Sequence, residues 1–235
     1  MVTNLLGPSL EDLFNLCGKK FSLKTTLMLF YQLLERVQHM HERSYIHRDI
    51  KPDNIMMGLG QESNTVHLID FGLTRLVINP KTGQHIPFIG RKNLIGTCRY
   101  VSVNSHKGFE LSRRDDLITL GYVMINLIKG NLPWQNIRIS KNSARYSKVG
   151  KFKEDYPIEK LCEGCPVQFQ IYMHYVTCMQ FEEAPNFDLL KNLISLAAHE
   201  AKINLHDNEF DWTKQLRQKQ NIRVAKPLSI KFNPV

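Results

Sequence analysis

A run of apolar residues in the middle of the chain places the tightest constraint on its fold. Residues 117–128 read LITLGYVMINLI, and a helix that is apolar on nearly every side must be buried. Ser112 followed by Asp115 is typical of a capped helix start. Gly130 and Pro133 predict where this helix ends. The most apolar stretch, LGYVMINLI, is about half as long as a membrane span requires, so we expect a buried central helix and no membrane span.

The sequence on either side predicts further helices. Ser9 and Asp12 have the spacing of a capping-box variant. Apolar residues recur along one face of residues 22–43, which predicts a long helix. Two more helices are expected near 166–181 and 186–199. The expected fold is therefore mainly α.

Two short apolar runs, NIMM and TVHLI, predict a small β-hairpin with the loop GLGQESN between them. Residues 74–110 are irregular, rich in Gly, Pro, Asn and charged residues, and too long for a simple connection. Loops of this size are usually functional or disordered. From about Lys214 the tail is polar and basic and lacks clear periodicity.

Bulk composition limits the classes of function. The net charge of +9 indicates either anionic partners or a solvated basic surface. Five scattered cysteines indicate reduced thiols in an intracellular protein, so we expect a cytoplasmic or nuclear location. Cys162 and Cys165 form a lone C-x-x-C pair, which is weak support for a metal site. The N-terminal residues lack the regions of a signal peptide.

The charged string HRDIKPDN, residues 47–54, carries the chemistry. Its pattern H-R-D-x-K-x-x-N is the catalytic-loop signature of protein kinases. In that role Asp49 would orient a substrate hydroxyl and accept its proton, and Lys51 would neutralise charge on the transferring phosphoryl group. Asn54 would bind a metal ion on the phosphate side. Any one of these residues alone would be explained equally well by a polar turn.

A D-F-G triplet sixteen residues after Asn54 makes the polar-turn explanation improbable. Asp70 would end a strand, where its carboxylate could hold the other Mg²⁺. Gly72 would let the chain turn, and Phe71 would pack inward. The string and the triplet together resemble a protein kinase.

Further motifs narrow the resemblance to the casein kinase I family of Ser/Thr protein kinases, most like its alpha members. They are LLGPSLEDLFNLC, IHRDIKPDN, QHIPF, NLIGTCRYVSVNSHKG, SRRDDLITLGYVMINLIKGNLPWQ, FEEAPNFDLL and FDW, in the family's order across residues 1–220. The usual kinase A-P-E triplet is absent, and Ser102–Asn104 stands where this family carries an S-I-N motif. The resemblance implies ATP and Mg²⁺ as cofactors.

The resemblance also implies roles for individual residues. Thr97 would bond Asp49 and Lys51. Asp116 would brace the backbone around His47 and Arg48, although an acid in a first helical turn is also favoured by the helix dipole. Further implied sites are an anion site for acidic or phosphoprimed substrates at Arg99 and Arg145, and an adenine and nucleotide site at Leu5, Leu6, Asp53, Asn54 and Asp70. Six Lys or Arg residues lie between Arg138 and Lys153, so a solvated basic face also remains open for most of them.

The departure from the family lies at the N-terminus. The sequence contains no G-x-G-x-x-G loop and no V-A-I-K strand, both of which belong to the small lobe of a kinase. Residues 1–6 match the end of that lobe and the hinge. We therefore expect a hinge remnant at 1–6, a kinase large (C-terminal) lobe at 7–213 without its small lobe, and a basic tail at 214–235. We also expect the apolar hairpin to be left uncovered.

The sequence thus predicts a Ser/Thr kinase lobe that acts on acidic or phosphoprimed proteins, and that is inactive as this chain. The alternative is a non-catalytic module that binds acidic or phosphorylated partners. Specific nucleic-acid binding would rest on charge alone, and no motif supports it.

Overall fold

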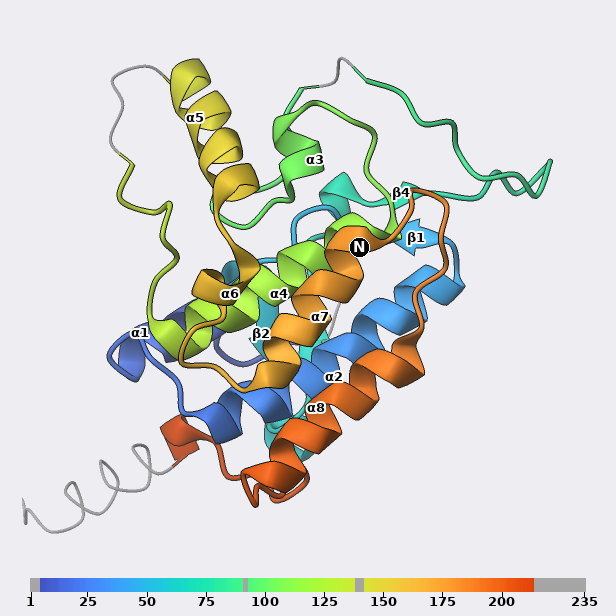
Figure 1. Cartoon of the computed structure of the whole chain (residues 1–235). Coiled ribbons are helices and arrows are strands. Elements are labelled where there is room, and N and C mark those ends of the chain that lie inside the picture. The colour runs from blue at the N-terminus through green and yellow to red at the C-terminus, as the bar shows by residue number, and fades with distance from the viewer. Residues whose placement is uncertain (1–4, 91–92, 138–141, 214–235) are drawn as a thin grey trace, which may run out of the picture.

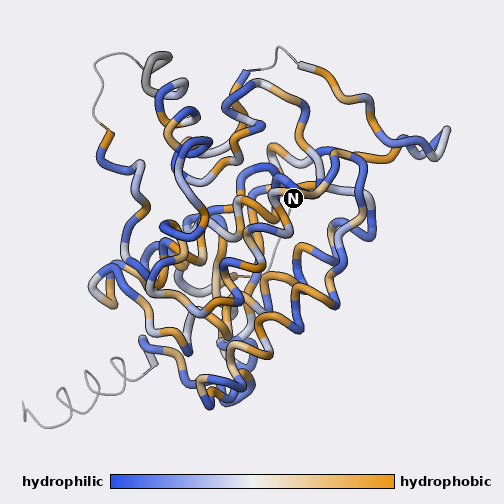
Figure 2. The backbone as a smooth tube through the Cα atoms, viewed as in Figure 1, coloured by the Kyte–Doolittle hydropathy of each residue, from blue (hydrophilic) through white to orange (hydrophobic). Residues whose placement is uncertain are grey.

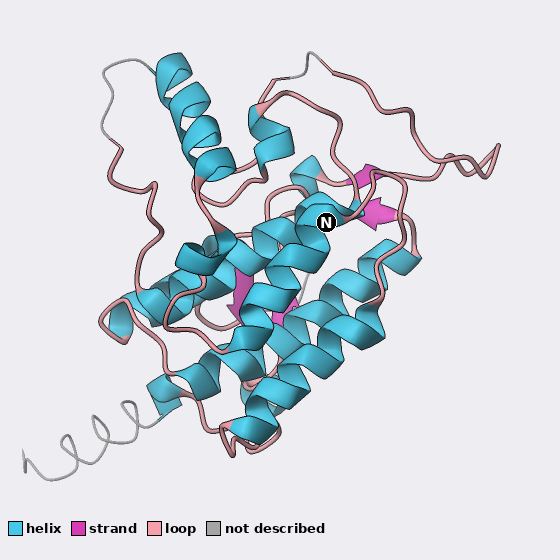
Figure 3. Cartoon of the chain, viewed as in Figure 1, coloured by secondary structure: helices cyan, strands magenta, loops and turns pink. Residues whose placement is uncertain are grey.

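The computed structural model describes residues 5–90, 93–137 and 142–213, except for the side chains of residues 142–145. In this part of the chain the protein is helix-rich and carries two small sheets (Figures 1 and 3). Its α-helices are α1 (Leu10–Leu16), α2 (Leu23–Glu42), α3 (Val103–His106), α4 (Arg113–Lys129), α5 (Asn142–Asp155), α6 (Ile158–Leu161), α7 (Val167–Cys178) and α8 (Phe187–Glu200).

The two sheets are antiparallel pairs. β1 (Tyr45–Ile46) pairs with β4 (Arg75–Leu76), and β2 (Ile55–Met57) pairs with β3 (Val66–Leu68). Three short 3₁₀ helices, η1 (Pro52–Asn54), η2 (Gly60–Glu62) and η3 (Phe71–Leu73), lie in the connections. The mainly α prediction with one small hairpin is confirmed, and β1–β4 is an additional pair.

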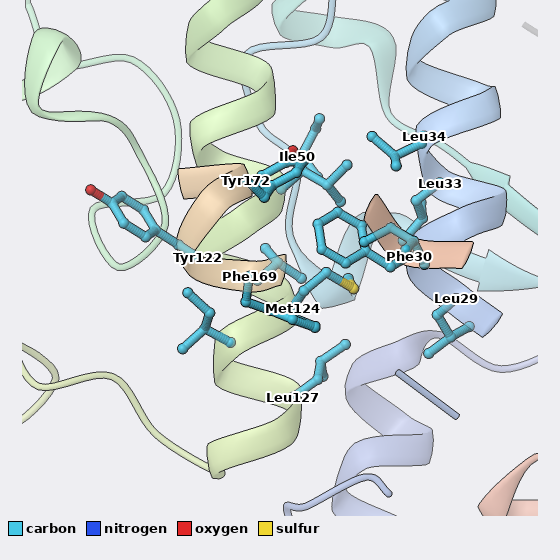
Figure 4. Close-up of a cluster of buried hydrophobic side chains, with 14 of the residues drawn as sticks. Leu29, Phe30, Leu33, Leu34, Ile50, Tyr122, Met124, Leu127, Phe169 and Tyr172 are labelled. Carbon is cyan, nitrogen blue, oxygen red and sulfur yellow. The ribbon is translucent and has the colours of Figure 1, made fainter. Parts of the chain in front are cut away.

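The predicted central helix is α4, which is buried from Asp115 to Leu127 and packs against α2 and α7. It begins with the predicted capping box of Ser112 and Asp115, and ends at Gly130, whose φ is +86°. Next to it Phe30 of α2 meets Tyr172 of α7 edge to face, with ring centroids 4.9 Å apart (Figure 4). The core therefore forms around α4, as the sequence predicted.

The outer helices are amphipathic. Along α2 and α8 apolar residues alternate with polar ones at helical spacing, and these two helices pack together (Figure 2). Ser9 caps α1 with Asp12 in the predicted box, and Ser22 caps α2. All of these helices start and end within a few residues of the predicted bounds.

The expectation that the hairpin would be left uncovered is wrong. Its apolar residues Ile55, Met57, Val66 and Leu68 are buried, because α1 packs on β2 and α2 packs on β3. Leu5 and Leu59 are the exposed apolar residues nearby.

Helix α5 was not predicted, because its sequence is basic and lacks an apolar stripe. It projects beyond the helices that surround α4 (Figure 1). Residues 74–110 are mostly irregular as expected, apart from β4 and α3. No described helix has the length and apolar character needed to cross a membrane. Residues 1–4 and 214–235 lie outside the described residues, so the predicted domain limits stay predictions.

Candidate active site

The loop between β1 and β2 carries the H-R-D-x-K-x-x-N string. Arg48 has a φ of +70°, in the left-handed region, so the backbone changes direction directly before Asp49. η1 then leads straight into β2. Asp49 is buried and Lys51 is half-buried. The short strands on each side fix both ends of the loop.

The carboxylate of Asp49 gathers three side chains. Lys51 Nζ donates to Oδ2 at 2.7 Å, and Asn54 Nδ2 donates to the same oxygen at 3.2 Å. Thr97 Oγ1 donates to Oδ1 at 2.7 Å, although it lies 48 residues away in the sequence. The structure therefore brings all four predicted catalytic residues into one hydrogen-bonded group.

These contacts decide the charge of Asp49. Burial opposes its ionisation, but hydrogen bonds from Lys51 and Thr97 outweigh that effect and hold the pKa of Asp49 below its usual range. The carboxylate is therefore ionised at neutral pH, the state in which it can accept a hydroxyl proton. The expected bond between Thr97 and Lys51 is not among the bonds of the described residues, because the two donors use different oxygens of Asp49.

Asp116, in the first turn of α4, binds the backbone of the catalytic loop. Its carboxylate accepts the backbone N–H groups of His47 at 2.7 Å and Arg48 at 2.8 Å. His41 Nε2 lies 3.0 Å from the same carboxylate. Burial opposes the ionisation of Asp116, yet these hydrogen bonds leave its pKa lowered. A buried anion thus fixes the strained turn before Asp49.

The D-F-G triplet is joined to this loop through the backbone. Ile69 N–H donates to Asn54 O at 2.9 Å, and Ile69 O lies 3.0 Å from His47 Nε2. Asp70 follows directly, is exposed, and has a φ of +64°. Gly72 N–H donates to its Oδ1 at 3.3 Å. Asp70 and Asn54 therefore lie on two adjacent backbone segments that are joined by a hydrogen bond.

The residues at this point fit a hard divalent cation. Asn54 uses its amide nitrogen for Asp49, which leaves its amide oxygen available. Asp70 adds an exposed carboxylate. Mg²⁺ prefers such oxygen ligands and completes its shell with water and phosphate. Asn54 and Asp70 are thus the residues that would hold the ion.

Phe71 does not pack inward as expected. Its side chain is 40% exposed, and its ring lies edge-on to His47 with centroids 5.7 Å apart. Among the described residues no second aromatic ring meets it, so its outer face is open to solvent. Gly72 lies in the turn of η3, as expected.

The predicted nucleotide-binding residues are less closely connected. Gly7 N–H donates to Met57 O at 2.8 Å, which places Leu6 beside β2. Leu5 is 84% exposed. Asp53 is exposed in η1, and no hydrogen bond among the described residues joins it to Asp49 or Asn54. The structure does not bring these three residues together with the catalytic group by any direct bond.

A second segment, residues 96–105, lies against the catalytic loop. Gly96 has a φ of +89°, and a Cβ there would lie 2.5 Å from Arg48 O. Trp134 Nε1 donates to Arg99 O at 2.7 Å. Ser102 and Asn104 donate to Asp115 Oδ1 at 2.7 and 2.9 Å. This segment is therefore held at several points beside Asp49.

The predicted anion site is described only in part. Arg99 is exposed, and its Nη1 donates to Tyr100 Oη at 3.3 Å. Arg145 lies in α5, but its side chain is outside those described. Lys153, counted among the basic residues of this region, is 5% exposed and so belongs to no solvated face.

Sequence reasoning missed the supporting roles of His41, Trp134 and Lys153, and it missed the contact of Asp115 with Ser102 and Asn104. Only Asp115 carried a signal, its capping-box position, and that signal pointed to helix structure alone. The others act through tertiary contacts that no local pattern encodes.

Comparison with known proteins agrees with this geometry. The family model described as the protein kinase domain matches residues 1–200, a span that includes the catalytic loop, the D-F-G triplet, Thr97 and Asp116. Members of this family use ATP with Mg²⁺ to phosphorylate proteins. The chain belongs to the protein kinase family.

Proposed function

We propose that this chain is the large lobe of a casein kinase I-type Ser/Thr protein kinase that acts on acidic or phosphoprimed proteins. The observation that carries the proposal is the group formed by Asp49, Lys51, Asn54 and Thr97, with distances of 2.7–3.2 Å. Transfer of a phosphoryl group to a hydroxyl requires an ionised carboxylate beside a lysine, and this group provides both. The motifs of residues 95–135 favour the casein kinase I type. A cytoplasmic or nuclear location is part of the same proposal.

In this mechanism the Ser or Thr oxygen attacks the γ-phosphorus of ATP, and the bond from that phosphorus to the β–γ bridging oxygen breaks. Asp49 orients the hydroxyl and takes its proton. Lys51 lies beside Asp49 and neutralises negative charge on the transferred group. Thr97 fixes the second oxygen of Asp49, so that the carboxylate cannot rotate away. Asn54 and Asp70 would hold Mg²⁺, which would supply neutralisation of the phosphate charge.

We further propose that Arg99 and Arg145 bind the phosphate or acidic side chain that directs the substrate. Leu5 and Leu6 would offer backbone groups to adenine, and Asp53 would border the phosphates. Arginine suits an anion site because its planar fork can form two hydrogen bonds to one phosphate.

A second candidate is a non-catalytic module that binds acidic or phosphorylated partners. The observation in its favour is that these 235 residues contain no glycine-rich loop and no strand lysine. Positioning of the phosphates provides most of phosphoryl-transfer catalysis. We therefore expect negligible activity from residues 1–235 alone.

The test is transfer of labelled γ-phosphate to an acidic Ser peptide. The chain would be assayed alone and joined to the small lobe of an active casein kinase I. We expect transfer only from the joined protein, with a loss of at least about 1000-fold in Asp49→Asn. If the joined protein folds but shows no transfer that depends on Asp49, the binding module is the better account. Efficient transfer by residues 1–235 alone would disprove the expected inactivity.

A further inference from the structure

Lys153 is a buried lysine that forms no ion pair with any carboxylate in the described part of the chain. Its side-chain nitrogen donates to Cys98 O at 3.0 Å and Val101 O at 2.7 Å. It also lies 5.2 Å from the ring centre of Tyr122 and 5.0 Å from that of Trp134. Among the ion pairs of the described residues, none joins Lys153 to a carboxylate. A buried charge is costly unless it is paired, so this arrangement needs an explanation.

The same lysine lines a cavity of about 260 Å³ between α3, α4, α5, α6 and α7. The rings of Tyr122, Trp134 and Tyr156 form much of its wall. Tyr122 is 5% exposed, and its hydroxyl points away from the apolar cluster of the core (Figure 4). That hydroxyl has no hydrogen-bond partner among the described residues. The cavity is thus lined by a residue that carries a buried amine and by one that carries an unused hydroxyl.

Neighbouring charges do not neutralise Lys153. His106 is kept neutral, because burial and the nearby lysine lower its pKa to about 4. Glu154 also lines the cavity, but its carboxylate accepts a hydrogen bond from Lys107 at 2.6 Å. When Lys153 is protonated, the charge left uncompensated at the cavity is therefore positive.

Size and wall chemistry define the ligand further. Pockets for drug-sized ligands start at roughly 300 Å³, so this cavity suits one or two fused rings. Aromatic walls favour a flat ring, which stacks or meets them edge-on. A carboxylate on that ring could accept from the lysine and from the tyrosine hydroxyl.

We propose that this cavity binds a small aromatic carboxylate, with its carboxylate on Lys153 and Tyr122 and its ring between Trp134 and Tyr156. This is a site separate from the catalytic group and does not rest on the proposed kinase function. Because Lys153 holds the carbonyl groups on both sides of Arg99, occupancy of the cavity would bear on residues 98–101. The site is thus placed to act on the segment that lies beside the catalytic loop.

The test is calorimetric titration of the 235-residue chain with 2-naphthoate, which stands for the ligand class. The charge-reversed control is 2-naphthylmethylammonium. We expect one naphthoate per chain and no binding of the cation. Lys153→Met should weaken naphthoate binding at least about tenfold, the equivalent of one charge-assisted hydrogen bond. Lys151→Met, on the exposed face of the same helix, should leave it unchanged.

A second pair of variants guards against misfolding of Lys153→Met. Thr177→Phe adds a ring at the cavity wall and leaves the lysine in place, and should also reduce binding. Ile171→Phe, exposed on the same helix but outside the cavity, is its control. Equal binding of anion and cation, no binding of naphthoate, or full binding by both Lys153→Met and Thr177→Phe would overturn the site.

A pH series adds a readout that a structural role would not give. Burial lowers the pKa of Lys153 to about 7, so an anion that needs the charged lysine should bind less tightly above pH 7, by up to about tenfold per pH unit. His106 titrates below this range, and burial moves Tyr122 above it. Cys98→Ser and Glu154→Gln should keep the pH dependence. A dependence that vanishes in either of these variants would contradict the assignment to Lys153.

Discussion

Two neighbouring carboxylates at the start of α4 support two different regions, and their environments differ. Asp116 accepts hydrogen bonds from the catalytic loop, at His47 and Arg48. Asp115 accepts hydrogen bonds from residues 102–112, through Ser102, Asn104 and the Ser112 backbone. Asp116 has a lowered pKa, whereas burial raises the pKa of Asp115.

The difference follows from the partners. Asp116 receives two backbone N–H groups and lies beside His41 and His47, whose fields favour its ionised form. Asp115 is bonded mainly by neutral side chains, which do not offset the cost of its burial. One helix turn thus fixes the catalytic loop with a firmly ionised carboxylate, and residues 102–112 with a carboxyl group that ionises less readily.

The largest effect is expected from Asp116→Asn. The amide presents an N–H group toward two backbone donors, so buried groups lose their partners at the strained turn. We expect a loss of about 3–5 kcal/mol in the free energy of unfolding, measured by urea denaturation. A loss no larger than that of Asp115→Asn would break the comparison.

Gly96→Ala should come next. The residue has a φ of +89°, and the added Cβ would lie 2.5 Å from Arg48 O and 2.7 Å from Val101 Cγ1. We expect a loss of about 2–3 kcal/mol, because strain and overlap act together. Gly90→Ala is the matched control, since its Cβ would lie 3.7 Å from Phe109. Equal stability of the two variants would show that the loops are not in close contact.

Asp115→Asn should lower the free energy of unfolding by a smaller amount, about 1–2 kcal/mol. The Ser102 hydroxyl can rotate to suit an amide, and loss of the charge removes an unfavourable burial. Ser102→Ala should give a similar loss by the same denaturation assay. An effect above 3 kcal/mol would mean that Asp115 is as tightly integrated as Asp116.

The pH dependence of stability should have opposite signs at the two positions. The lowered pKa of Asp116 gives a stabilisation that is present above the unfolded pKa of about 3.9 and is lost as pH falls through the folded value. The raised pKa of Asp115 gives a destabilisation that grows as pH rises above about 3.9. Compared with the parent protein, Asp116→Asn should therefore lose the least free energy of unfolding in acid. The free energy of unfolding of Asp115→Asn should increase relative to the parent as pH rises. Parallel profiles would contradict the opposite shifts.

Local patterns predicted α1, α2, α4, α7 and α8, because each has caps or an apolar face that one stretch of sequence encodes. Helix α5 was not predicted, because it is held by the burial of Lys153 and Val149 and not by an apolar stripe along the helix. The catalytic string and D-F-G could be read directly, since their spacing is set by chemistry. His41, Trp134 and Lys153 could not, because each acts on residues more than 30 positions away.

The most direct test of the proposed division between the catalytic group and an anion site at Arg99 and Arg145 is titration of a primed phosphoserine peptide at physiological salt. Arg99→Ala/Arg145→Ala should weaken binding at least about tenfold, the equivalent of about 1.4 kcal/mol. Lys148→Ala/Lys151→Ala, two exposed charges on the same helix as Arg145, should change it little, and Asp49→Asn should leave it intact. Equal losses in the two double variants, or a loss in Asp49→Asn as large as that of the arginines, would contradict the account.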